Sequence, residues 1–93
     1  MSGPDVVSDA ELETMKKRVA AARAGPWRSS IEGRDHTSGS SFIMVGEGDE
    51  RSEDIEVVGA TPHDQDFMAH ARQDVPRLIA EVERLRRLLS ARG

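Results

Sequence analysis

The sequence predicts an α+β fold: an N-terminal helix, a small antiparallel β-meander and a kinked C-terminal helix with a coiled-coil seam. Both ends of the chain repeat apolar residues at spacings of three and four, which is typical of amphipathic helices. The middle alternates short runs of β-branched residues with glycine, serine and acidic stretches, which is typical of strands and turns. We expect one domain over residues 1–93, made of a flexible tail (1–7), a helix (8–24), a β-rich middle (27–59) and a kinked helix (61–91).

The first helix has clear sequence signals at both ends. Ser8 and Glu11 form a capping-box pattern, in which each side chain bonds the backbone amide of the other residue. Gly25 and Pro26 are expected to end the helix, because glycine accepts a left-handed cap and proline cannot continue the helix. Between these signals runs a narrow apolar stripe of Leu12, Met15, Val19 and Ala22.

Three strands are predicted in the middle of the chain, over 27–31, 41–45 and 53–58. Alternation allows two inner faces for the second strand, Phe42 with Met44 or Ile43 with Val45. A sheet this small is marginal unless a helix covers it. Trp27 directly follows the glycine-proline stop and is the best candidate for the contact between sheet and helix.

The last helical region begins with Thr61 as cap, Pro62 as first helical residue and Asp64 two positions later. Phe67, Met68 and Ala71 are expected to form its apolar face. Pro76 predicts a break or kink over 73–75, since the residue before a proline avoids helical angles. The expected result is a short helix (62–72), a cap at Asp74 and a long helix (75–90).

The long helix carries the predicted oligomer interface. Its apolar residues recur at spacings of three, four, three and four, the pattern that lays one helix along another: Val75, Leu78, Val82, Leu85 and Leu89. The same stripe could form a hairpin within one chain, against Leu12, Met15 and Val19. Both can hold, because Ile79 and Leu88 widen the apolar face. We therefore expect a homo-oligomer.

Composition excludes several classes of protein. The absence of cysteine rules out disulfides, thiolate zinc sites and thiol nucleophiles. A net charge of -4 argues against general nucleic-acid binding, which needs lysine and arginine along the phosphates. No secretory signal and no apolar run of about 20 residues is found, so we expect no membrane contact and a cytoplasmic location.

Candidate ligand-binding residues are few. Trp27, Arg28, Arg34, Arg51 and Arg72 are of the types that stack on a base or hold a phosphate. Helical spacing also aligns His63, Asp66, His70 and Asp74, which could bind a divalent metal or serve a metal-dependent enzyme. Capping and solvation explain these four residues more simply. We expect no catalytic residue, no metal and no cofactor.

Two segments resemble small phage and prophage proteins of the Ead-like kind: A-R-A-G-P-W-R at 22–28, and D-F-M-A-H-A-R-Q-D-V-P-R-L-I-A-E-V-E-R-L-R at 66–86. The resemblance implies an accessory protein with a coiled-coil terminus, and it carries no catalytic residues. It favours a non-enzymatic, oligomeric binding protein that acts through protein contacts or sequestration. The alternative, similar in general plan only, is a viral anti-defence protein that captures a cyclic nucleotide or ADP-ribose-type immune signal at a subunit interface.

Overall fold

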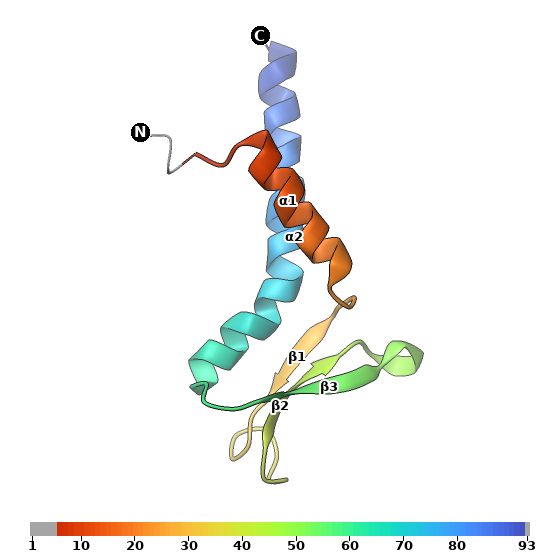
Figure 1. Ribbon diagram of the computed structural model, residues 1–93, viewed down its shortest axis with the longest axis vertical. Helices are drawn as coiled ribbons and strands as arrows, with labels where there is room; N and C mark the ends of the chain where they lie inside the picture. The colour runs from red at the N-terminus through yellow and green to blue at the C-terminus, as the bar shows by residue number, and fades with distance from the viewer. Residues whose placement is uncertain (1–5, 93) are drawn as a thin grey trace. The chain divides into compact units, whose positions relative to one another are not determined.

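The computed structural model describes residues 6–92 and confirms the α+β fold class (Figure 1). The predicted flexible tail lies outside the described residues, apart from its last two positions. The elements in order are α1 (Asp9–Ala21), β1 (Trp27–Ser30), β2 (Ser41–Val45), a 3-10 turn (Gly48–Glu50), β3 (Ser52–Val57) and α2 (Pro62–Arg92). All three strands lie within one or two residues of the predicted bounds.

The chain forms two compact units. The helix unit contains Met1–Ala22 and Val75–Gly93, and therefore α1 with the second part of α2. The sheet unit contains Arg23–Asp74, and therefore the three strands with the first part of α2. One helix thus contributes to both units.

The predicted capping box starts α1. The amide of Glu11 donates to Ser8 Oγ at 3.0 Å, and the amide of Ser8 donates to Glu11 Oε1 at 2.8 Å. The hydrogen bond from the Ser8 amide holds the pKa of the Glu11 carboxyl below its ordinary value. These two bonds satisfy amides that the first turn of a helix leaves without helical partners.

The predicted end of α1 is wrong. The helix stops at Ala21, and Ala22 leaves it in an extended conformation with φ -77° and ψ 154°. The glycines with positive φ are Gly33, Gly39, Gly46, Gly48 and Gly59, so Gly25 provides no left-handed cap. The Ala22 amide still bonds the Arg18 carbonyl at 3.2 Å, so the chain can leave α1 without one.

The sheet is an antiparallel meander in the order β1-β2-β3. Its register pairs Trp27 with Val45 and Ile43 with Ile55, and an irregularity between β2 and β3 follows Ile43. Ile43 and Val45 are buried whereas Phe42 and Met44 are only half-buried, which decides between the two predicted inner faces. Trp27 is also only half-buried, so aliphatic residues form the centre of this core.

The first part of α2 contacts the sheet through polar residues. Gln65 is 2% exposed, and its Nε2 donates to the carbonyls of Phe42 at 3.0 Å and Ser30 at 3.3 Å. Gln73 Oε1 accepts from the Trp27 amide at 2.8 Å, and Gln73 Nε2 donates to the Trp27 carbonyl at 3.1 Å. The prediction that Phe67 belongs to an apolar face is wrong, since Phe67 is 74% exposed, whereas Ala71 is half-buried and Met68 lines a groove with sheet residues. These glutamines give hydrogen-bond partners to backbone groups of β1 and of β2 beside it.

The predicted start of α2 is confirmed, and the predicted break is wrong. The Asp64 amide donates to Thr61 Oγ1 at 3.0 Å, and the Thr61 amide donates to Asp64 Oδ2 at 3.1 Å. From Pro62 the helix continues without interruption to Arg92, so Asp74 lies within it and caps nothing. A proline removes one hydrogen bond from the ladder, and the bonds on either side of Pro76 keep a helix of 31 residues continuous.

Candidate functional site

In the helix unit, α1 lies along the second part of α2. Lys16 Nζ is 2.7 Å from Glu83 Oε2, and Arg86 Nη1 is 2.6 Å from Asp9 Oδ1. Leu12 and Ile79 are 6% and 7% exposed, one from each helix. The predicted hairpin within one chain therefore forms, with Ile79 as its buried residue on α2.

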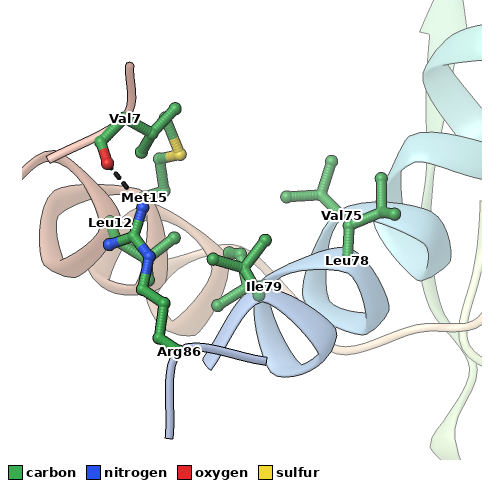
Figure 2. A pocket seen from close by; sticks show the side chains of 8 residues that line it. Val7, Leu12, Met15, Val75, Leu78, Ile79 and Arg86 are labelled. Carbon is green, nitrogen blue, oxygen red and sulfur yellow. Dashed lines mark hydrogen bonds between the residues drawn. The ribbon is translucent and has the colours of Figure 1, made fainter. Parts of the chain in front are cut away.

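Between the two helices lies a groove of about 410 Å³, which we call the helix groove (Figure 2). At one end, Arg86 Nη2 donates to the carbonyl of Val7 at 2.5 Å. Apart from that guanidinium, the side chains around the groove are aliphatic or thioether: Val7, Leu12, Met15, Val75, Leu78, Ile79 and Val82.

The predicted seam lies on the open side of the helix pair. Three of its residues, Val75, Leu78 and Val82, line the helix groove. Leu78, Leu85 and Leu89 are 64%, 45% and 66% exposed, and Leu88 beside them is 49% exposed. Monomeric proteins rarely leave so continuous an apolar surface in water, and such patches commonly mark interaction sites. We call this surface, Val75 to Leu89 together with the helix groove, the leucine face.

The predicted ligand-binding arginines lie at separate places in the sheet unit. Arg34 forms a forked pair with the Asp66 carboxylate, through Nη1 at 2.8 Å and Nη2 at 3.1 Å. Arg51 pairs with Asp54 at 2.7 Å. Arg72 Nε donates to the Arg23 carbonyl at 2.8 Å, whereas Arg28 is exposed on β1 opposite Met44.

Trp27 shares no groove with those arginines. It lines a second groove, of about 610 Å³, whose lining residues include none of the four. Its indole Nε1 is buried without a hydrogen-bond partner. Nucleotide capture by this set of residues stays a prediction, and the pairing of three arginines with protein oxygens does not support it.

The aligned histidines and aspartates do not gather into a metal site. Within residues 6–92, no group of three or more such side chains could hold a metal ion. His70 Nδ1 lies 3.0 Å from the backbone carbonyl of Asp66, while the Asp66 carboxylate is occupied by Arg34.

Across residues 6–92, no helix is long and apolar enough to span a bilayer.

No protein-family model, curated protein or solved structure matches this chain. The Ead-like resemblance therefore stays a prediction from the two quoted segments.

The Arg34–Asp66 pair should make the free energy of unfolding depend on pH in the acidic range. Hydrogen bonds from Arg34 lower the pKa of the Asp66 carboxyl from 3.8 to about 2. A carboxyl whose pKa is lowered by folding stabilises the folded state at pH values above its unfolded-state pKa. That stabilisation is lost as the pH falls through its folded-state pKa. We expect the free energy of unfolding to decline between about pH 4 and pH 2 in urea titrations. Asp66→Asn should flatten that decline, whereas Asp49→Asn, at an exposed aspartate of the 3-10 turn, should leave it unchanged.

Three important residues escaped the sequence analysis: Gln65, Gln73 and Arg86. The two glutamines lie four residues either side of Ala69, so helical spacing places all three on one face of α2. A helix face that carries a small apolar residue between two glutamine side chains is a recognisable signal for a helix packed against strand backbone. Arg86 had no such signal, because its partners Asp9 and Val7 are remote in sequence.

Proposed function

We propose that this protein is a non-enzymatic, self-associating binding protein of phage or prophage type, whose copies join through the leucine face. The exposed row of leucines on α2 is the observation that carries the proposal. The phage or prophage setting, and the cytoplasm of a bacterial host, rest on the two quoted segments alone. The assembled protein would act by contacting or sequestering another molecule.

The leucine face offers enough apolar surface for a dimer. The exposed fractions of Leu78, Leu85, Leu88 and Leu89 together equal about two fully exposed leucines per copy. Burying one leucine is worth about 1.5–3 kcal/mol, so a symmetric pair gains about 6–12 kcal/mol. Association itself costs about 4–15 kcal/mol. The largest gain and the smallest cost leave about 8 kcal/mol, which is the free energy of a dimer with micromolar affinity, so the leucine face supplies micromolar affinity at most.

Leu85→Glu should separate the copies. A carboxylate at this position would be buried without a partner in the joined state, which is strongly unfavourable. We expect the dimer dissociation constant to rise at least about 100-fold, measured by sedimentation equilibrium. Because Leu85 is 45% exposed in the single chain, the circular dichroism spectrum should remain helical.

Ser90→Glu is the matched control, since it adds the same charge at an exposed position one turn and a residue further along α2. Its dissociation constant should stay within about threefold of the parent value. A parent chain that sediments as a monomer throughout the micromolar range would refute the proposal. So would a Leu85→Glu variant that assembles as tightly as the parent.

A further inference from the structure

The first part of α2 covers only one side of the sheet's inner face. Gln65 and Gln73 bind backbone groups of β1 and of β2 next to it. The remaining side of that face is open and forms the 610 Å³ groove, which we call the sheet groove. Its apolar lining is Trp27, Ile43, Ile55, Val57, Val58, Ala60 and Met68.

The sheet groove runs beside an open strand edge. In the order β1-β2-β3, strand β3 pairs with β2 on one side only among the described residues. Near its start, the Glu53 carbonyl accepts from Arg23 Nη1 at 2.7 Å. Over the rest of β3, no strand within residues 6–92 pairs with the outer edge, so its backbone can pair with an added strand.

Acidic side chains surround this edge. Asp64 lines the sheet groove, and Glu56 borders it between Ile55 and Val57; both are exposed. Glu53 and Asp54 are also exposed on β3, and Asp54 pairs with Arg51 at 2.7 Å. Neighbouring residues of a strand point to opposite faces of the sheet, so Glu56 and Ile55 face opposite ways. The side chains of Ile55 and Val57 therefore lie on the inner face of β3, with Glu53 at its start, and those of Asp54 and Glu56 lie on the outer face.

We propose that β3 docks an extended peptide segment of a partner protein, in which apolar and basic side chains alternate. The segment adds a fourth strand, its apolar side chains enter the sheet groove, and its basic side chains meet Glu56 and its acidic neighbours. A period of two is needed to place the two kinds of side chain on opposite faces, which a helix cannot do along one strand. This inference is independent of self-association and names the class of partner.

Trp27 provides a direct readout, because it is the only tryptophan, the chain has no tyrosine, and its side chain lines the sheet groove. The probe is a synthetic peptide of about eight residues that alternates valine and lysine, close to the length of a strand. We expect saturable change in Trp27 emission on titration. Two comparison peptides, one alternating valine and glutamate and one with valine and lysine at helical spacing, should give at least about tenfold weaker binding.

Paired charge variants test the location. Glu56→Lys should weaken binding of the valine-lysine peptide at least about tenfold, because it places like charges opposite each other. Glu47→Lys makes the same change in net charge at an exposed residue outside the sheet groove, and should change affinity less than about twofold. Equal weakening by both variants would show diffuse attraction to an acidic protein and overturn the proposal.

Two other outcomes would also overturn it. Equal affinity for the helically spaced peptide would mean that a helix docks here. If Trp27 emission changes with protein concentration, and if raising that concentration prevents the peptide from binding, a second copy fills the groove. Sedimentation of the same samples separates this inference from the proposed function. A protein that self-associates but does not bind the peptide contradicts only the proposed peptide docking. A protein that stays monomeric and binds the peptide contradicts only the proposed self-association.

Discussion

Replacing Gly46 with alanine should destabilise the protein by about 2–5 kcal/mol in urea-induced unfolding. Gly46 has a φ of +75°, a left-handed conformation that disfavours a side chain by about 1–2 kcal/mol. A Cβ there would also lie 2.2 Å from the backbone oxygen of Glu50, and such overpacking costs about 1–3 kcal/mol more. The clash is with backbone, and the Gly46 amide is bound to the Pro26 carbonyl at 2.8 Å, so the turn cannot easily move away.

Gly48→Ala separates conformational strain from the clash. Gly48 also has positive φ, at +56°, but a Cβ there would meet no atom within 4 Å. We expect a loss of about 1–2 kcal/mol, from the backbone conformation alone. If the two variants unfold at the same urea concentration, the close approach to Glu50 has no energetic importance.

Ile79→Ala should destabilise the helix unit by about 2–5 kcal/mol, the usual range for removing a large buried aliphatic side chain. Ile79 is 7% exposed and lines the helix groove together with Leu12. Its loss would leave a space between α1 and α2 that the two helices can close only in part. Amide hydrogen exchange in α1 and in the second part of α2 should report the change.

Leu78→Ala is the matched control for that prediction, because Leu78 precedes Ile79 in α2 but is 64% exposed. At concentrations where the copies are separate, it should change the unfolding free energy by less than about 1 kcal/mol. Its larger effect should be on assembly, which sedimentation detects. The reverse order, with Leu78→Ala the more damaging to the single chain, would mean that the wrong residue has been placed in the helix-pair core.

Local chemistry made much of the fold predictable. The caps at Ser8 and Thr61 need only residues three positions away, so the sequence shows both partners together. The three strands follow from short runs of β-branched residues between turn residues. Alternation could not choose between the two faces of β2, because both Ile43 with Val45 and Phe42 with Met44 are apolar. The choice depends on which face α2 covers, and that is decided by packing.

The errors came from treating strong local signals as decisive. Gly25 and Pro26 do not cap α1, because the chain has already left the helix in an extended conformation at Ala22. Pro76 does not divide α2, because one missing bond is a small loss in a helix this long. Phe67 is exposed because the sheet presents backbone groups that need hydrogen bonds, and glutamines satisfy them.

For the candidate sites too, features set by residues close in sequence could be predicted, and features set by residues far apart in sequence could not. The leucine spacing alone placed the seam on the second part of α2. That α1 would cover Ile79 and leave Leu78 exposed depends on how the two helices are rotated against each other, which spacing does not define. Likewise, Arg34 resembles a phosphate ligand in isolation, but Asp66, 32 positions away, already fills its guanidinium fork.

The boundary between the two units crosses the chain twice, between Ala22 and Arg23 after α1, and between Asp74 and Val75 inside an unbroken helix. Domain boundaries normally lie in exposed linkers, where a protease or a recombination event can separate the parts. Here a cut at the boundary would leave each fragment with half a helix and new unsatisfied backbone ends. Neither unit can therefore be excised by cutting at loops alone, because one of the two crossings runs through helical backbone.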